Sequence, residues 1–361
     1  MDKILCYIDS LGAGGAQRQL VGLAKELSTK GYDVTICVYA DIPFYVHEIK
    51  DTNIRYKYLS KAQNKFLKLF YTYKYIKELK PDCVISFLEM PSIIMCIIKI
   101  VLKKFKLIVS ERNTTQKITR LDRMRFYLFK QADYIVSNSY TQDKFIKRNF
   151  PFLSNKCLPI INFVDTEKFN MVKHEMSDLV KFIVAASISP SKNTLNFIQS
   201  IKDVINEGYT NFEVNWYGIV DHNDTYYIQC EKVITENNLS KFIKLLPKTI
   251  DICQKYHESD FFCLPSIYEG TPNALTEALS CGIPSICSDV SDNSHYVIDS
   301  YNGFLFNPKS SASMASAIIK CLELRTEEYL LFAQRSRATA VEQFNINKFA
   351  NSYINLISDC L

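Results

Sequence analysis

Two glutamates in one short stretch offer the clearest chemistry in the sequence. Glu269 and Glu277 lie within residues 265–284, on either side of an expected helix start with Thr271 as N-cap and Pro272 at the first helical position. Their spacing suits two contacts along one ligand, and carboxylates accept hydrogen bonds from sugar hydroxyls. A helix that begins after the Gly270 turn also offers N–H groups to an anion. The alternative is one acid favoured by the helix dipole beside one solvated glutamate.

Two further segments are candidate phosphate sites. Ser189 as N-cap and Pro190 at the first position place Lys192 in a first helical turn, where the dipole disfavours a cation unless an anion is near. The alternative is a solvated lysine. The glycine-rich residues 12–17 follow an expected first strand, although Gln17 stands where a dinucleotide fingerprint needs a third glycine. A tight turn alone would also explain these glycines.

These residues need a scaffold, and the length and pattern of the chain indicate an α/β one. The 361 residues exceed what a single core spans, so we expect two domains. With 47% hydrophobic residues and no low-complexity tract, disordered and fibrous classes are excluded. We place an N-terminal domain at 1–170, a second domain at 171–345 that opens with a polar linker, and a C-terminal helix at 346–361 that packs back on the first domain.

Short apolar runs alternate with helical patterns in both halves, which is typical of parallel-sheet domains. A helix is expected to open at Ser139 with a capping box to Gln142, and the pattern from 327 to 361 is helical throughout. Open α/β sheets bind ligands at the carboxyl ends of their strands, so we expect a cleft enzyme. The expected strands are 3–8, 33–39, 54–58, 83–87, 107–110, 134–137, 182–186, 213–217, 243–246, 261–264 and 285–287.

Charge is divided unevenly along the chain. Residues 1–170 hold 28 Lys and Arg against 16 Asp and Glu, a net +12, whereas the remainder carries 15 against 22, a net −7. The basic half is expected to attract phosphates or an anionic membrane surface. No nucleic-acid-binding motif is present, so we expect no nucleic acid partner.

One basic segment has the pattern of an amphipathic helix. Apolar residues recur at helical spacing, with lysines on the flank, and the alternative is that this stripe packs on its own sheet while the lysines are solvated. The apolar residues are Phe66, Leu69, Phe70, Tyr73 and Ile76, and the lysines are Lys61, Lys65 and Lys68, with Lys99, Lys103, Lys104 and Lys106 nearby in sequence.

Cysteine usage and hydropathy indicate the compartment. The twelve cysteines show no C-x-x-C pair and mostly sit in apolar runs, so we expect buried thiols and no metal site. The longest apolar stretch, residues 92–102, is about half the ~20 residues that a membrane span needs. The N-terminus fits a strand better than a signal peptide. We expect a cytoplasmic protein, peripheral on the inner face of the cell membrane.

The stretch Glu269, seven residues, Glu277, followed by Ala-Leu-Ser-Cys-Gly-Ile-Pro, resembles the motif of retaining glycosyltransferases of family 4. Gly-Gly-Ala-Gln at 14–17, Asn-Phe-Val-Asp at 162–165 and Ser-Pro-Ser-Lys at 189–192 are similar to further segments of that family, in the same order. The resemblance covers essentially the whole chain. It implies the GT-B fold, two facing Rossmann-like domains with the nucleotide-sugar on the C-terminal one.

The resemblance also implies roles for residues. Glu277 would hold the ribose hydroxyls of the nucleotide, Glu269 the transferred sugar and Lys192 the diphosphate. Glu111 is a candidate acceptor ligand or base, unless it only pairs with Arg112 or the backbone. The implied donor-binding residues are Gly15, Lys192, Glu269, Gly270, Thr271, Pro272, Asn273, Leu275 and Glu277, and the acceptor-binding residues are Gly14, Arg18, Arg112 and Asn113.

Three positions depart from the family pattern. Ser187 stands where an arginine is usual, so Arg18 or Arg112 would supply that charge, or the backbone amides and Lys192 would suffice without it. Asn193 replaces a common glycine, and Phe163 replaces another, which we expect to change only a linker turn. Residues 110–113 and 85–89 resemble a subgroup that builds surface polysaccharides and lipid-linked glycans.

The implied activity is transfer with retention from a nucleotide-sugar, expected to be UDP-linked, to a glycan or lipid-linked glycan. The sugar would be a hexose or an N-acetylhexosamine, and neither a cofactor nor a metal is expected. The alternatives are a GT-B sugar-nucleotide epimerase and a non-enzymatic nucleotide-sugar binding protein.

Overall fold

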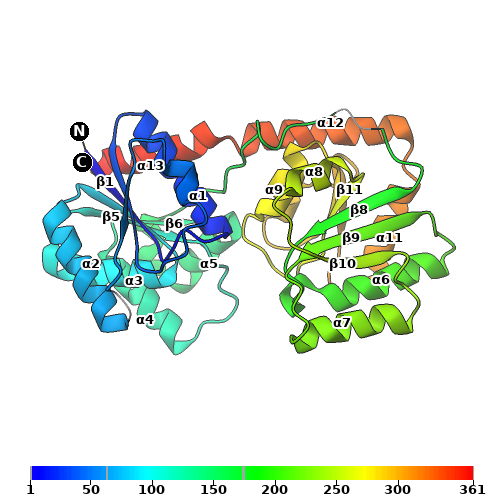
Figure 1. The fold of residues 1–361 in the computed structure, drawn as a ribbon, viewed down its shortest axis with the longest axis horizontal. Coiled ribbons are helices and arrows are strands. Elements are labelled where there is room, and N and C mark those ends of the chain that lie inside the picture. Colours follow the sequence, from blue (N-terminus) through cyan, green and yellow to red (C-terminus); the bar gives the residue numbers. More distant parts are fainter. Residues whose placement is uncertain (1, 62–63, 173–174, 361) are drawn as a thin grey trace. The chain divides into compact units, whose positions relative to one another are not determined.

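A computed structural model describes residues 2–61, 64–172 and 175–360 as two compact units (Figure 1). Unit 1 comprises Met1–Phe163 with Ile346–Leu361, and unit 2 comprises Val164–Asn345. The division lies earlier than the boundary expected after residue 170. The reason is local: the backbone of Phe163 bonds to the Gln19 side chain in unit 1, whereas the Val164 N–H donates to the Phe344 carbonyl in unit 2.

Unit 1 is built on a parallel sheet. Its described strands run in the order β3-β2-β1-β4-β5-β6-β7, and every pairing in it is parallel. Most of these strands are buried, which explains their near-continuous apolar sequences. They are β1 (Lys3–Tyr7), β2 (Asp33–Val38), β3 (Arg55–Tyr58), β4 (Cys83–Phe87), β5 (Lys106–Glu111), β6 (Tyr134–Ser137) and β7 (Cys157–Pro159).

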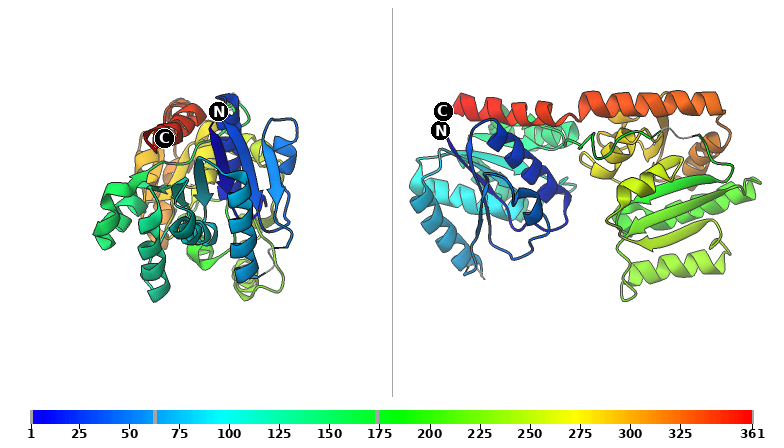
Figure 2. Two further views of the ribbon diagram at one scale, coloured as in Figure 1. Left: turned by 90° about the vertical axis from the view of Figure 1, so that its left-hand side faces the viewer. Right: turned by 45° about the horizontal axis from the view of Figure 1, so that its top comes forward.

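Helices cover both faces of this sheet (Figures 1 and 2). On one face α1 (Gly15–Thr29) packs beside α13 (Ile346–Cys360), the last helix of the chain. The other face carries α2 (Lys65–Leu79), α3 (Glu89–Leu102), α4 (Arg120–Leu128) and α5 (Tyr140–Asn149). Short 3-10 turns are η1 (Val46–Ile49), η2 (Phe129–Gln131) and η3 (Pro151–Lys156).

Unit 2 repeats the plan with a second parallel sheet. Its described strands run β10-β9-β8-β11-β12-β13. They are β8 (Val180–Ala185), β9 (Phe212–Gly218), β10 (Ile243–Pro247), β11 (Phe261–Leu264), β12 (Ser285–Ser288) and β13 (Gly303–Phe306). The helical elements are η4 (Pro190–Lys192), α6 (Thr194–Asn206), α7 (Thr225–Glu236), α8 (Ile252–His257), α9 (Asn273–Ser280), α10 (Asn293–Tyr296), α11 (Ser311–Leu322) and α12 (Thr326–Gln343).

The α/β class is confirmed, and each expected strand coincides with an observed one to within two residues at either end. β7 and β13 were not expected. β13 opens with Gly303, where an added Cβ would come within 1.9 Å of the Ser285 carbonyl oxygen, so the position needs glycine although glycine weakens the strand pattern. The C-terminal segment is not helical throughout, because residues 344 and 345 separate α12, which ends at Gln343, from α13, which starts at Ile346.

The helix expected to open at Ser139 is confirmed, but the expected capping box is wrong. Its side chain caps α5 by accepting from the Gln142 N–H at 3.1 Å, whereas the Gln142 amide bonds to Thr115 instead of completing a capping box. No helix among residues 2–61, 64–172 and 175–360 is long and apolar enough to cross a membrane.

Each sheet changes direction of winding at one point, between β1 and β4 in unit 1 and between β8 and β11 in unit 2. A crevice for ligands forms outside the carboxyl ends of the strands at such a point. In unit 2 the segment after β8 carries Lys192 and the segment after β11 carries Glu269. In unit 1 Gly14 follows β1 and Glu89 follows β4.

Candidate functional site

A lysine and a glutamate meet at the carboxyl ends of β8 and β11. Lys192 Nζ lies 2.5 Å from Glu269 Oε1, and the Ser266 hydroxyl donates to the same oxygen. The Glu269 N–H donates to Ser291 Oγ at 3.1 Å. Glu269 is 9% exposed while the Lys192 side chain keeps 24% of its surface. The carboxylate is therefore held from several sides, and the ammonium is accessible to a ligand.

The backbone around Lys192 differs from the expectation. Residues 190–192 form the 3-10 turn η4, so Lys192 lies before helix α6 and not in its first turn. Asn193 separates the two elements with φ 61° and ψ 31°, a left-handed conformation that asparagine tolerates. Its Nδ2 donates to the Pro308 carbonyl at 2.7 Å. This geometry explains why asparagine can stand where the family commonly has glycine.

Serines occupy the segment where the family has an arginine. The hydroxyl oxygens of Ser187 and Ser189 lie 3.4 Å apart, and those of Ser189 and Ser191 lie 3.1 Å apart. The Ile267 N–H donates to the Ser191 carbonyl at 2.9 Å, which ties this segment to the one that carries Glu269. The position of the missing arginine thus holds neutral hydroxyls that can donate to phosphate oxygens.

Glu277 is positioned by a phenol. Tyr256 of α8 donates its hydroxyl to Glu277 Oε2 at 3.0 Å, and both residues are buried, with Glu277 6% exposed. Glu277 lies in the middle of α9, whereas Glu269 lies in the loop between β11 and α9. The two glutamates are therefore held by different partners, Lys192 and Ser266 for one and Tyr256 for the other.

The start of α9 corrects two expectations. Pro272 is the N-cap and the helix begins at Asn273, because Pro272 has an extended backbone with ψ 117°. Thr271 therefore does not cap the helix, and its hydroxyl lies 3.4 Å from that of Tyr296. Leu275, another expected donor-binding residue, is fully buried. The first-turn N–H groups of α9 have no partner within the helix and can receive an anion.

In unit 1 Glu111 ends β5 and is 1% exposed. Its charged partner is Arg125 at 3.3 Å and not Arg112, and the backbone N–H of Asn113 also donates to it. Arg125 also pairs with Glu89 and Asp122, so one cation faces three carboxylates. The pKa of Glu111 is raised to about 7. Burial is the main cause, Glu89 adds to the rise, and Arg125 opposes it. A carboxyl with this pKa can take up a proton near neutral pH, although it lies inside the domain.

Arg112 serves the packing of α13. Its guanidinium donates to Asn162 Oδ1 and to the Tyr353 hydroxyl, each at 2.8 Å, and stacks 4.1 Å from the centre of the Phe87 ring. Burial of the guanidinium lowers the pKa of Arg112. These two hydrogen bonds and the stacking on Phe87 hold the guanidinium inside unit 1.

The other expected acceptor residues lie at the same edge of unit 1. Asn113 is exposed, with Nδ2 3.4 Å from Glu89 Oε1. Gly14 is the N-cap of α1 and Gly15 its first residue, and Arg18 is partly exposed one turn later. Glu89, with 43% of its side chain exposed, was not among the expected site residues and offers a more accessible carboxylate than Glu111.

The expectation that Phe163 changes only a linker turn is wrong. Its ring is buried 5.1 Å from the ring of Phe349 and lies against Gly22, where an added Cβ would come within 2.1 Å of it. Phe163 is a core residue of unit 1, and Gly22 has to be glycine to accommodate it.

Only part of the basic segment expected to form an amphipathic helix has an exposed apolar face. α2 begins at Lys65, so Lys61 lies outside it, and Lys68 stacks on the Tyr39 ring at 4.4 Å. Ile76 is buried, and Leu69 and Tyr73 pack on the core, whereas Phe66 is 86% exposed and Phe70 57% exposed. Lys99 pairs with Asp133 and is therefore not part of an open basic surface.

A second exposed apolar stripe was missed. Leu121, Met124 and Tyr127 recur every three residues on α4 and are 76%, 64% and 62% exposed. Exposed basic residues flank this α4 stripe, namely Lys117, Arg120, Arg123 and Lys130. The spacing was visible in the sequence, but it indicated a helix without telling which face meets water.

Comparisons with known proteins identify relatives over the whole chain. Residues 13–168 match the family model "Glycosyltransferase Family 4", and residues 166–339 match "Glycosyl transferases group 1". The chain is 27% identical to the GalNAc-alpha-(1->4)-GalNAc-alpha-(1->3)-diNAcBac-PP-undecaprenol alpha-1,4-N-acetyl-D-galactosaminyltransferase of Campylobacter jejuni, over 99% of each chain.

It is also 25% identical to the N-acetylgalactosamine-N,N'-diacetylbacillosaminyl-diphospho-undecaprenol 4-alpha-N-acetylgalactosaminyltransferase of the same organism, over 98% of this chain and 100% of the relative. Among solved structures, Anabaena HepE in complex with UDP and glucose superposes with a TM-score of 0.85 at 18% identity, covering 99% of this chain and 100% of that one.

Proposed function

Because the chain belongs to the family 4 glycosyltransferases and has the GT-B fold, we propose that it moves a hexose or N-acetylhexosamine from a UDP-sugar to a lipid-linked glycan, with retention of anomeric configuration. The two Campylobacter relatives, whose names state diphospho-undecaprenol acceptors and N-acetylgalactosamine transfer, support the class of acceptor and of sugar. The HepE complex with UDP supports the nucleotide.

One observation carries this proposal: Lys192 and Glu269 are joined at the carboxyl ends of neighbouring strands in unit 2. A nucleotide-sugar has a diphosphate next to a polyhydroxylated ring. The ammonium of Lys192 would receive the diphosphate, and the carboxylate of Glu269 would then be free to accept hydrogen bonds from sugar hydroxyls. The serine hydroxyls at 187, 189 and 191 add neutral donors beside the phosphate oxygens.

Glu277 completes the donor site. We assign the two ribose hydroxyls to the carboxylate of Glu277, whose Oε2 also accepts from Tyr256, because a carboxylate can accept several hydrogen bonds at once. A carboxylate that is already oriented loses little side-chain entropy on binding. The ribose would then be fixed by α9 and the diphosphate by the segment after β8.

The transfer itself needs few protein groups. The acceptor hydroxyl oxygen forms a bond to the anomeric carbon on the face from which the diphosphate leaves, the bond from that carbon to the phosphate oxygen breaks, and the hydroxyl proton passes to the departing oxygen. Lys192 and the N–H groups at the start of α9 stabilise the negative charge that develops on the diphosphate. Positioning by Glu269 and Glu277 keeps the donor aligned.

The α4 stripe supports a location at a membrane. Leu121, Met124 and Tyr127 can enter the interface while the basic residues around them meet anionic headgroups, each at ~1 kcal/mol. We propose that the protein binds peripherally to the inner face of the cell membrane, where a lipid-linked acceptor would be reached by unit 1.

The test is transfer from a panel of UDP-sugars with and without an undecaprenyl-diphosphate-linked glycan. We expect a new glycosidic product only with acceptor, an α-linkage by NMR coupling from an α-linked donor, and loss of turnover in Lys192→Met but not in the control Lys232→Met, a surface lysine. An epimerised nucleotide-sugar without acceptor would establish an epimerase. Binding of UDP-sugar with no turnover on any acceptor would leave a binding protein.

Measuring transfer in the presence of a chelator tests whether the mechanism needs a metal. We expect transfer to continue in EDTA at an unchanged rate, because Lys192 and backbone N–H groups are assigned to the diphosphate. Loss of turnover that added Mg²⁺ or Mn²⁺ restores would contradict this assignment.

A further inference from the structure

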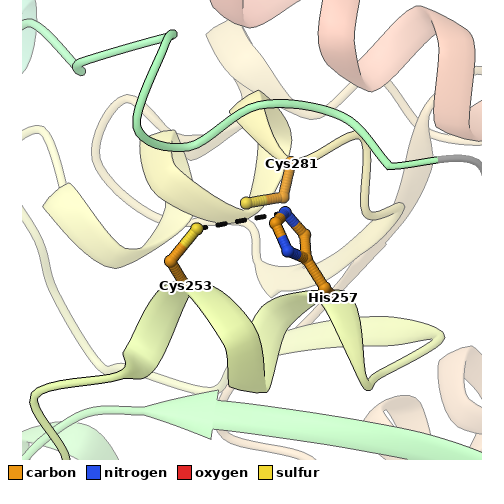
Figure 3. Close-up of side chains that lie close together, drawn as sticks. All are labelled: Cys253, His257 and Cys281. Atoms are coloured by element: carbon orange, nitrogen blue, oxygen red, sulfur yellow. Dashed lines mark hydrogen bonds between the residues drawn. The ribbon is translucent and has the colours of Figure 1, made fainter.

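Three side chains of unit 2 that could ligate a metal lie close together, two on α8 and one just after α9. The two sulfur atoms of Cys253 and Cys281 and one imidazole nitrogen of His257 all lie within 4.8 Å of one another. Figure 3 shows Cys253 and His257 on the same side of α8, with Cys281 facing them from the end of α9. This cluster was not expected from the sequence, because Cys253 and His257 are one helical turn apart whereas Cys281 follows a different helix, 24 residues after His257.

The arrangement follows from the local fold. Residues four apart on a helix share a face, so Cys253 and His257 point the same way, while Tyr256 points to the interior and bonds to Glu277. Cys281 is the C-cap of α9 and precedes Gly282, which has φ 75°. This left-handed turn ends the helix and holds the Cys281 thiol toward α8.

The site is accessible. Of the eleven cysteines whose side chains the structure describes, ten are buried, and Cys253 is the partly exposed one. His257 is partly exposed as well, and His257 and Cys281 line a pocket together with Met171 and Gly282. An ion can therefore reach the three side chains from solvent.

Two of these side chains bond to backbone oxygens in the structure. Cys253 Sγ donates to the Lys168 carbonyl oxygen at 3.1 Å, and His257 Nε2, 2.8 Å from the Asn170 carbonyl oxygen, donates to it as N–H. A bound ion would replace the Cys253 proton and would need the His257 proton on Nδ1 if Nε2 is the ligand. Cys253 Sγ and His257 Nε2 are 3.9 Å apart. That separation is close to the distance between two ligands of one tetrahedral ion with bonds of ~2.1 to 2.3 Å.

We propose that Cys253, His257 and Cys281 bind a thiophilic divalent cation, with Zn²⁺ as the best match, outside the transfer chemistry. Two thiolates and one imidazole form a donor set that suits zinc and disfavours magnesium and calcium. The fourth position is left to a water or to one of the two carbonyl oxygens. The ion would tie α8 to the end of α9, and binding releases the two thiol protons.

The test uses the full chain, reduced and stripped of metal, and titrates it with Co²⁺ as a spectroscopic probe for zinc. We expect one equivalent to bind, with thiolate-to-cobalt absorption and visible bands of a tetrahedral site that Zn²⁺ abolishes. Cys253→Ser should lose about half of the thiolate absorption, and both Cys253→Ser and His257→Gln should weaken binding by at least ~10-fold. The matched control His222→Gln changes an exposed histidine and should bind as the wild type does.

A thermal melt gives a second readout. Zn²⁺ should raise the melting temperature of the wild type and of His222→Gln but not that of Cys253→Ser, because an ion that binds only the folded state stabilises it. The proposal is overturned if no tetrahedral cobalt spectrum forms, or if both site variants bind as the wild type does. It is also overturned if the reduced protein binds no metal and Cys253 and Cys281 instead form a disulfide in air.

Discussion

Tyr256 and Glu277 form a buried hydrogen bond of 3.0 Å that joins α8 to α9. Removing the hydroxyl in Tyr256→Phe keeps the ring but leaves one carboxylate oxygen without this donor. We expect UDP affinity to fall by roughly 3- to 10-fold, consistent with the ~1 kcal/mol of one hydrogen bond, with kcat less affected. Calorimetric titration with UDP measures this, with Tyr329→Phe as the buried-phenol control. Unchanged UDP affinity would mean that the hydrogen bond from Tyr256 to Glu277 does not contribute to nucleotide binding.

Glu269→Gln removes the charge that Lys192 and Ser266 contact while keeping the side-chain size. We expect kcat to fall by roughly 100-fold, as for loss of one aligned group in an active site, with a smaller change in UDP affinity. Steady-state kinetics and UDP titration separate the two effects. Glu258→Gln, an exposed acid paired with Lys255, is the control. A variant with normal kcat would place the transferred sugar elsewhere.

The raised pKa of Glu111 makes stability depend on pH. The folded state holds the proton up to about pH 7, whereas the unfolded chain releases it near 4.5, so the folded state binds more protons between these values. Stability from this group is therefore lost as pH rises from 4.5 to about 7, by on the order of 3 kcal/mol at most.

Glu111→Gln cannot ionise and should not show this loss. Urea unfolding of both proteins across that pH range should give a stability difference in favour of the variant that grows with pH and levels off above about 7. A pH-independent difference would mean that Glu111 stays ionised in the folded protein.

Tyr353 holds α13 on unit 1 through its hydroxyl, which contacts Ser110 Oγ at 3.1 Å and receives a hydrogen bond from Arg112. Tyr353→Phe leaves a guanidinium donor unpaired in the interior. We expect unfolding free energy to drop by ~1 to 3 kcal/mol in urea. The exposed Tyr127→Phe should change it by less than ~0.5 kcal/mol. Equal stability of both variants would show that the hydroxyl contributes little.

The α4 stripe should mediate membrane binding. We expect the protein to sediment with vesicles that contain anionic lipid, and salt that shortens the Debye length from ~10 to ~3 Å should release it. Leu121→Gln with Met124→Gln should weaken sedimentation while leaving UDP affinity intact. The control pair Ile100→Gln with Val101→Gln changes exposed apolar residues at the end of α3. If both pairs behave alike, α4 is not the contact surface.

The sequence predicted elements well where burial alone determines them. Residues 261–264 are apolar because a central parallel strand is covered on both faces, and β11 matches the expected bounds. Lys192 and Glu269 are 77 residues apart, yet both follow strands that meet where the sheet changes its winding, so their proximity follows from topology.

Contacts that depend on how helices turn were not predictable. The face of the short helix α8 is set by tertiary packing, which decides that Tyr256 faces Glu277 while Cys253 faces Cys281. Arg125 as the partner of Glu111 depends in the same way on where α4 docks. Sequence spacing contains no information about either choice.

The placement of α13 has a consequence during synthesis. One face of the unit 1 core is completed by residues that are made only after the whole of unit 2, namely Phe349, Ala350, Tyr353, Leu356 and Ile357. At 5 to 20 residues per second, residues 164–345 take roughly 10 to 40 s to emerge between the two parts of unit 1. The nascent first domain waits that long with an apolar face uncovered, while unit 2 has all its residues in one continuous run and can fold earlier. A ribosome that stops before residue 346 therefore releases a chain whose first domain cannot close its core.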